Sequence, residues 1–201
     1  MIKPTTPLLI LLTVATYAQT SLHDKRDGKT YKTVKIGTQI WMAENLNYDA
    51  ENSKCYENKP ENCEKYGRLY NWETAMKSCP KGWHLPNNKE WQILVDLAGG
   101  NKIAGTKLKA KRGWTEDLDD RGRVMTVATD EYGFSALPGG RSTSDDNFRD
   151  VDFNGFWWSS SSENYSLSID AYYRRMYNNN GRAIWYPGSK TGLFSVRCVQ
   201  D

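Results

Sequence analysis

The sequence predicts an α+β fold: two helices with small antiparallel sheets and a long irregular loop region, held together by disulfides. Segments that alternate apolar and polar residues occur near both ends of the chain, and two short helical patterns lie between them. The middle of the chain is rich in glycine, which favours turns and irregular backbone. Only 38% of the residues are apolar, but eight are Trp and twelve are Tyr, so we expect a core built on large rings.

Five stretches are predicted to be strands from their alternation or from an adjoining turn. Residues 31–36 alternate, and a two-residue turn leads into residues 39–43. Residues 170–177 and 183–186 are predicted to form a hairpin across Asn180-Gly181, a strong turn signal. Residues 193–199 also alternate, which would put Phe194, Val196 and Cys198 on an inner face and Arg197 on an outer face.

Two helices are predicted in the first half of the domain. The first covers residues 71–78 and ends before Pro80, because the residue before a proline disfavours helix. The second begins at Asn87 or Asn88, which can cap it, and ends at Gly99-Gly100. Its Trp91, Leu94 and Ala98 would share a buried face. Residues 47–66 are predicted to be a long loop, and residues 101–156 to be mostly irregular.

The chain divides into residues 1–18, a signal peptide; residues 19–30, a polar leader; and residues 31–201, one domain. Lys3 precedes the short apolar stretch 8–15, and Ala18 provides the small residue before a cleavage site. We therefore expect a secreted or cell-surface protein. There is no second apolar stretch, so no transmembrane segment is expected. The formal charge of +3 is nearly balanced, which argues against nucleic acid as a partner.

The four cysteines are even in number and contain no CxxC pair, which favours disulfides in an exported protein. Three connectivities are possible. Cys55 and Cys63 bracket a polar loop that would benefit from a local clip, which leaves Cys79 with Cys198. A free catalytic thiol is the rival interpretation.

Several stretches together resemble the Fibrobacter succinogenes major paralogous domain, a family of exported bacterial proteins. They cover most of residues 31–201: YKTVKIGTQIWMAENLNY (31–48), YGRLYNWETAMKSCPKGWHLPNNKEW (66–91), TDEYGFSALPGGR (129–141), GFWWSSS (155–161) and SVRCVQD (195–201). The order of elements also resembles the C-type-lectin-like fold, which is shared with formylglycine-generating and sulfatase-modifying enzymes. That resemblance implies a bridge from an early helix to the last strand, the places that Cys79 and Cys198 occupy.

Calcium is the one cofactor that the sequence suggests. The EPN, QPD and WND triplets of calcium-dependent lectins do not occur. However, Asp150, Asp152 and Asn154 have the spacing that opens a calcium loop, D-x-D-x-N-G. The twelfth position of such a loop is Ser161 rather than Glu, so a polar turn is the alternative interpretation.

Recognition by aromatic rings is the other route to a ligand, because Trp and Tyr can stack on sugar faces. The candidates lie in the irregular middle and on the late hairpin: Trp114, Tyr172, Tyr173, Arg174, Trp185 and Tyr186. Most of the remaining tryptophans are expected in the core. His84 has no recognisable nucleophile partner, so we interpret it as structural.

These observations favour a binding module without catalytic activity, with a polysaccharide or a surface protein as its partner. An enzyme, or a degenerate enzyme, of the formylglycine-generating type is the first alternative. A structural or adhesion subunit without a small ligand is the second.

Overall fold

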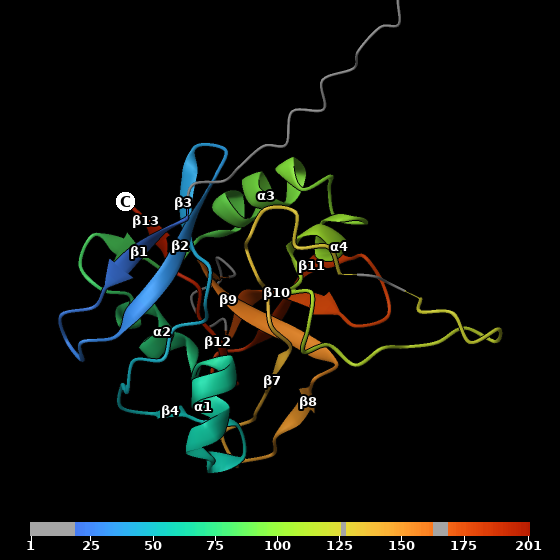
Figure 1. Ribbon diagram of the computed structural model, residues 1–201. Coiled ribbons are helices and arrows are strands. Elements are labelled where there is room, and N and C mark those ends of the chain that lie inside the picture. The colour runs from blue at the N-terminus through green and yellow to red at the C-terminus, as the bar shows by residue number, and fades with distance from the viewer. Residues whose placement is uncertain (1–18, 126–127, 163–168) are drawn as a thin grey trace, which may run out of the picture.

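The structure is a computed structural model that describes residues 19–125, 128–162 and 169–201. Two curled sheets, mostly antiparallel, contain more of the residues than the short helices that lie beside them (Figure 1). The first sheet has the strand order β1-β2-β3-β13-β6. Its strands are β1 (Gln19–His23), β2 (Thr30–Ile36), β3 (Gln39–Met42), β13 (Val199–Gln200) and β6 (Trp83–His84).

The second sheet has eight strands and follows the path β11-β10-β9-β12-β5-β4, with β7 joined to β9 and β8 to β7. The pairings of β12 and β7 with β9 are parallel, and the others are antiparallel. Its strands are β4 (Ser53–Lys54), β5 (Leu69–Tyr70), β7 (Gly139–Arg141), β8 (Arg149–Val151), β9 (Asn154–Ser162), β10 (Asp170–Tyr177), β11 (Ala183–Ser189) and β12 (Phe194–Ser195).

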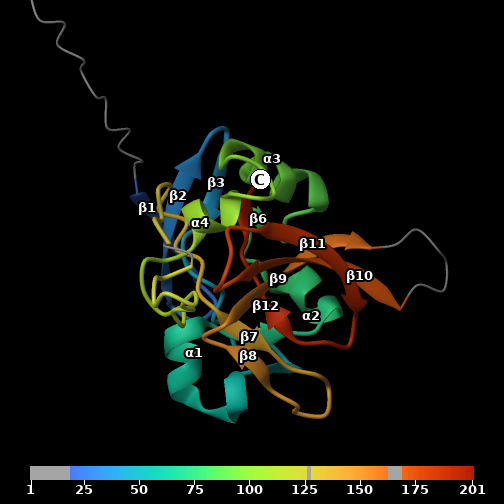
Figure 2. The ribbon, with the colours of Figure 1, turned by 90° about the vertical axis from the view of Figure 1, so that its right-hand side faces the viewer.

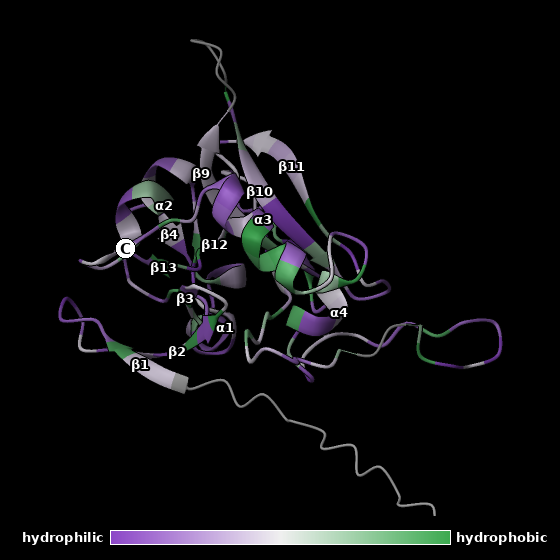
Figure 3. Ribbon diagram, turned by 90° about the horizontal axis from the view of Figure 1, so that it is seen from above, coloured by the Kyte–Doolittle hydropathy of each residue, from purple (hydrophilic) through white to green (hydrophobic). Residues whose placement is uncertain are grey.

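Both predicted helices are confirmed, and Asn87 caps the second one as expected. The helices are η1 (Tyr56–Asn58), α1 (Pro60–Tyr66), α2 (Trp72–Ser78), α3 (Asn88–Leu97) and α4 (Ala104–Leu108). The Asn71 side chain accepts a hydrogen bond from the first turn of α2. Asn87 and Glu90 form a reciprocal capping box at the start of α3, which satisfies backbone N–H groups that have no helical partner. In Figure 3 α3 carries both hydrophilic and hydrophobic stretches, as an amphipathic helix does.

Two segments that we predicted to be loop or leader are ordered elements instead. The prediction of a long loop over residues 47–66 is wrong, because α1 begins at Pro60, whose fixed φ suits the first turn of a helix. The buried Tyr66 anchors the other end of α1. In the polar leader, residues 19–23 form β1, which pairs with β2 and places Leu22 opposite Tyr31. In both segments the contacts that order the backbone come from other parts of the chain, which the local sequence does not show.

The predicted strand 193–199 is divided between the two sheets. β12 pairs with β5 and β9, whereas β13 pairs with β3 and β6, with Val199 opposite Trp41. The chain therefore passes from one sheet to the other between Ser195 and Val199. Because protein surrounds this crossing on all sides, alternation no longer separates an inner face from an outer one.

Arg197 lies in this crossing, and the prediction that it faces outward is wrong. Its side chain is fully buried. Nε donates to the side-chain oxygen of Asn45 at 2.8 Å, and Nη2 donates to the Ser135 carbonyl at 2.8 Å. Nη1 donates to the carbonyls of Met42 and Phe134. Four acceptors thus compensate for the loss of water around the guanidinium, and burial lowers the pKa of Arg197.

Both disulfides form with the predicted pairing. Cys55–Cys63 joins residues 8 apart, beside α1, and Cys79–Cys198 joins residues 119 apart, from the end of α2 to the residue before β13. Cys198 is fully buried. The longer bridge therefore ties the first half of the domain to the strand that completes the first sheet.

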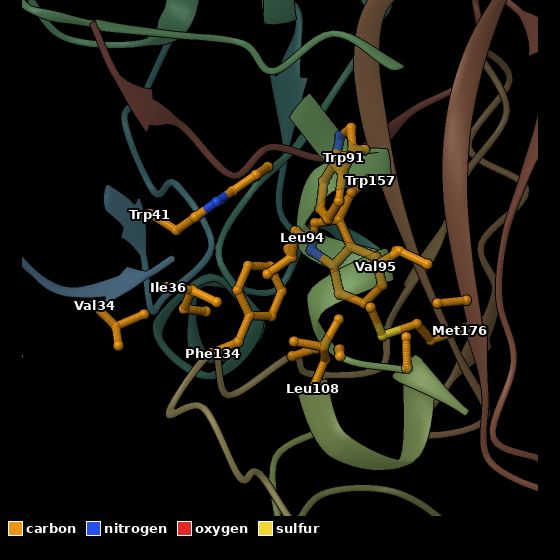
Figure 4. Close-up of a cluster of buried hydrophobic side chains, with 14 of the residues drawn as sticks. Val34, Ile36, Trp41, Trp91, Leu94, Val95, Leu108, Phe134, Trp157 and Met176 are labelled. Atoms are coloured by element: carbon orange, nitrogen blue, oxygen red, sulfur yellow. The ribbon is translucent and has the colours of Figure 1, made fainter. Parts of the chain in front are cut away.

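Large rings fill the core, as the composition predicts. Trp91 of α3 lies at the centre of one cluster, with its ring centroid 4.9 Å from that of Trp41, 6.0 Å from that of Phe134 and 6.4 Å from that of Trp157 (Figure 4). All four side chains are fully buried. A second cluster, on the other face of the second sheet, contains Trp158 and residues from α2, β5 and β12. The central strand β9 thus contributes aromatic side chains to both clusters.

Candidate functional site

The hairpin formed by β10 and β11 lies at the edge of the second sheet, and it holds most of the residues predicted to bind a ligand. β11 is the outermost strand of the path and, among the strands that the structure describes, pairs only with β10 (Figure 2). The register places Tyr172 opposite Pro187, Tyr173 opposite Tyr186 and Arg174 opposite Trp185. Because directly opposed residues share a face, the predicted set is divided between the two faces of the hairpin.

The first face contains Tyr172, Arg174 and Trp185. Toward the turn, this face is covered by the core cluster of α3 and α4, where Met176 and Ala183 are fully buried. Toward the other end of the hairpin, at Trp185, the core cluster no longer covers this face. The face therefore changes from core to surface along the length of one strand.

Trp185 is the exposed end of this face. Of the eight tryptophans, all within the described residues, it is the one classed as exposed, with 45% of its surface accessible. Its ring meets that of Tyr172 edge to face, with centroids 5.2 Å apart. Such packing holds an indole in a fixed orientation at the surface, which is the geometry that a stacking contact with a ligand requires.

The side chain of Arg174 is buried and does not reach the surface beside Trp185. It is 1% exposed, and its Nη1 donates to the Ala183 carbonyl at 3.3 Å and to the side chain of Asn101 at 3.4 Å. Among the described residues, its Nε and Nη2 have no partner. Burial lowers the pKa of Arg174 to about 10. A direct contact of Arg174 with a ligand, as we predicted, is not available in this conformation.

The second face carries Tyr173, Tyr186 and two residues that the predicted site left out, Arg175 and Tyr177. The hydroxyl oxygens of Tyr177 and Tyr186 lie 2.9 Å apart, and the Tyr173 and Tyr186 rings are 6.0 Å apart. Burial raises the pKa of Tyr177 to about 12, so the phenol stays protonated at neutral pH. The period of two along β10 assigns Tyr173, Arg175 and Tyr177 to one face, and it is the signal that could have found the last two.

Trp114 lies away from the hairpin faces, in the irregular stretch after α4. Its Nε1 donates to the Ala136 carbonyl at 3.0 Å, and its ring packs on the first core cluster. Lys109 lies beneath it, almost fully buried, with Nζ 5.1 Å from the ring centroid. Burial lowers the pKa of Lys109 to about 8. Nζ of Lys109 donates to the carbonyls of Tyr177, Asn178 and Asn180, which fixes the hairpin turn.

The three residues predicted to bind calcium extend from β8 to the start of β9, and the two aspartates have existing partners. Asp150 Oδ2 accepts from Nε of Arg141 at 2.8 Å. Asp152 accepts a hydrogen bond from the Tyr66 hydroxyl and lies 3.6 Å from Nζ of Lys65. Within the described parts of the chain, no group of three or more His, Cys, Asp or Glu side chains is placed to hold a metal ion. Calcium binding stays a prediction.

Two further observations concern the cysteines and the length of the helices. All four cysteines are in disulfides, so none is available as a thiolate. Over the described ranges, no helix combines the length and the apolar character needed to cross a bilayer. The predicted signal peptide, residues 1–18, lies outside the described residues.

Comparison with known families places the chain. Residues 34–200 match the Fibrobacter succinogenes major domain. The chain belongs to this family. The match begins within β2 and ends within β13, so this family domain includes the hairpin, α1 to α4 and both disulfides. The same comparison made with curated proteins and with solved structures found no match.

Proposed function

We propose that this Fibrobacter succinogenes major domain is an exported or cell-surface binding module that recognises polysaccharide and has no catalytic activity. The observation that carries the proposal is the exposed indole of Trp185, held by Tyr172 at the edge of a disulfide-linked scaffold. The other seven tryptophans are buried or half-buried, so Trp185 is the tryptophan whose ring is most available to a ligand.

We also propose that the domain has the C-type-lectin-like fold. The bridge from the end of α2 to the residue before the last strand supports this assignment, as does the long stretch between α4 and β7, which is irregular apart from isolated bridges. Rigid elements that hold adaptable loops are a common design for binding. The fold does not by itself specify a ligand, and the choice of polysaccharide rests on Trp185.

The pairing of the cysteines supports a function without catalysis. An enzyme of the formylglycine-generating type needs a reactive cysteine thiolate, and one of the two bridges would have to be reduced to supply one. His84 does not offer an alternative, because its two ring nitrogens already face Glu90 and Asp201.

Affinity electrophoresis in gels that contain neutral or acidic polysaccharides tests the proposal. We expect at least one polymer to retard the wild-type protein. Trp185→Ala should weaken that binding about thirtyfold, since a stacked ligand that covers roughly 100 Å² of indole gains about 2 kcal/mol. Ile93→Ala is the matched control, because Ile93 of α3 is equally exposed, at 46%, but lies on another element.

A parallel series with EDTA tests the calcium prediction, since a calcium-dependent lectin would lose its retardation when the metal is removed. Failure of every polymer to retard the wild-type protein would contradict the proposal. It would favour a structural or adhesion subunit, or a protein partner.

A further inference from the structure

The second face of the hairpin brings two arginines to one aromatic ring. The guanidinium carbon of Arg141, from β7, lies 5.3 Å from the centroid of the Phe156 ring, and that of Arg175, from β10, lies 5.1 Å from the same centroid. Neither arginine is fully exposed. Two like charges this close to one ring repel each other unless an anion lies between or beside them.

Only one of the two charges is neutralised within the described residues. Asp150 accepts from Nε of Arg141 at 2.8 Å and forms an ion pair with it. Arg175 forms no ion pair and donates no hydrogen bond to any residue that the structure describes. Its Nε is buried without a partner. The cluster of Arg141, Asp150 and Arg175 therefore has a net charge of +1, located on Arg175.

The Arg175 guanidinium lies close to two aromatic rings. Its central carbon lies 4.3 Å from the Tyr177 ring centroid and 5.1 Å from that of Phe156. Contact with two rings restrains a guanidinium, and the two Nη groups, unlike the buried Nε, can make two parallel hydrogen bonds to a carboxylate or sulfate.

Neighbouring phenols add hydrogen-bond donors of the same kind. Tyr177 and Tyr186 share one hydrogen bond, which uses one of their two hydroxyl protons and leaves the other free to donate to a ligand. Burial raises the pKa of Tyr173, so that phenol also remains a donor. A group that accepts several hydrogen bonds and carries negative charge matches these donors.

We propose that this Tyr–Arg face, formed by Arg141, Arg175, Tyr173, Tyr177 and Tyr186, binds the carboxylate or sulfate group of an acidic polysaccharide. The site lies on the face of the hairpin opposite to Trp185, so it is a second contact and does not depend on stacking at Trp185. It deepens the proposed function, on which its choice of a glycan rests, by naming the chemical class of the polymer.

Arginine Nε–Hε resonances of the full-length mature protein, followed by NMR, provide the test. The probes are oligogalacturonate, the same oligomer with its carboxylates methyl-esterified, and inorganic sulfate. We expect oligogalacturonate to shift the Arg175 resonance in a saturable way, and esterification to weaken this binding at least tenfold. Sulfate should act only at much higher concentration, because it lacks the sugar contacts.

Matched substitutions separate a specific site from general attraction. Arg175→Met should lose about tenfold in affinity for oligogalacturonate, the value expected for loss of a charge-assisted bidentate pair. Arg182→Met removes the same charge from the same hairpin at an exposed position and should change the affinity less than twofold. Trp185→Ala should keep the Arg175 response even where it loses neutral polymers.

Three results would overturn the inference, and each can be told apart from failure of the proposed function. No shift at Arg175 in the wild-type protein would exclude the anion site, whether or not neutral polymers bind at Trp185. Equal losses in Arg175→Met and Arg182→Met would show that attraction is unspecific. Saturation by sulfate at the same concentration as oligogalacturonate would identify a site for small anions instead of a glycan.

Discussion

Trp157 and Trp185 lie on the same face of one sheet, two strands apart, and their surroundings differ completely. Arg174 of β10 lies opposite Trp157 of β9 on one side and opposite Trp185 of β11 on the other. Trp157 is fully buried against Trp91, and Trp185 is 45% exposed. The difference comes from the cover, because Trp157 on β9 belongs to the core cluster that includes α3, whereas Trp185 on β11 lies outside that cluster. The same residue type thus serves stability at the centre of the sheet and is available for recognition at its edge.

Loss of the Cys79–Cys198 disulfide is expected to have the largest effect, because this bridge closes the longer of the two loops. Replacing Cys79 and Cys198 by Ala together should lower the free energy of unfolding by about 5 kcal/mol in the chain-entropy estimate for a loop of this length. The same replacement of Cys55 and Cys63, which close a much shorter loop at the periphery, should cost about 2.5 kcal/mol. Urea denaturation of the two double variants measures the difference. Equal losses would mean that the long bridge does not organise the scaffold.

Substitution of Trp157 and Trp185 tests whether the buried ring stabilises the fold more than the exposed ring does. Trp157→Ala should lower the free energy of unfolding by about 3–5 kcal/mol, because it leaves a cavity and removes the buried hydrogen bond from its Nε1 to the Asn45 side chain. Trp185→Ala should cost less than about 1 kcal/mol, because its ring is half in water. Chemical denaturation measures both. Similar losses at the two positions would contradict a division into a structural and a functional ring.

The opposite edge of the molecule offers a smaller, pH-dependent effect. His84 of β6 lies with Nδ1 2.6 Å from Oδ1 of Asp201 and with Nε2 2.8 Å from Oε1 of Glu90. Partial burial opposes protonation of His84, but the two carboxylates outweigh it and raise the pKa of His84 above its usual value. The stabilisation is therefore fully present below pH about 6.5 and is lost as the pH rises through the raised pKa.

We expect this contribution to be below about 1 kcal/mol, since the groups are partly in water. Thermal unfolding of wild type and His84→Gln between pH 5 and about 8.5 measures it. His23→Gln is the matched control, because His23 is the only other histidine. A wild-type profile that matches that of His84→Gln would show that the edge at β6 is not held by this ion pair.

Local signals in the sequence predicted the local elements. Asn87 and Glu90 mark the start of α3, and Asn180-Gly181 marks the turn of the hairpin, because capping and turn geometry depend on a few neighbouring residues. The disulfide pairing followed from counting and from the polar loop between Cys55 and Cys63.

The errors arose where distant parts of the chain decide the outcome. The alternation predicts that Arg197 points outward, but the carbonyls that accept its hydrogen bonds belong to the distant segments around residues 42 and 134. Arg174 looks like a neighbour of Tyr173 in the sequence, but it points to the opposite side of the sheet and under the helices. The Tyr–Arg face depends on Arg141, which comes from a strand some 30 residues before β10 and is placed there by the parallel pairing of β7 with β9. No short window of sequence contains that pairing.

The central claim is that the exposed indole at the sheet edge touches the ligand. Oxidative footprinting with peptide mapping by mass spectrometry measures this directly, with the intact protein alone and with saturating polysaccharide. The account predicts that Trp185 is among the tryptophans oxidised most rapidly in the free protein and that the polymer protects it, while oxidation of exposed Met76 on α2 is unchanged. Oxidation of Trp185 at the same rate in the bound and free protein would contradict the claim.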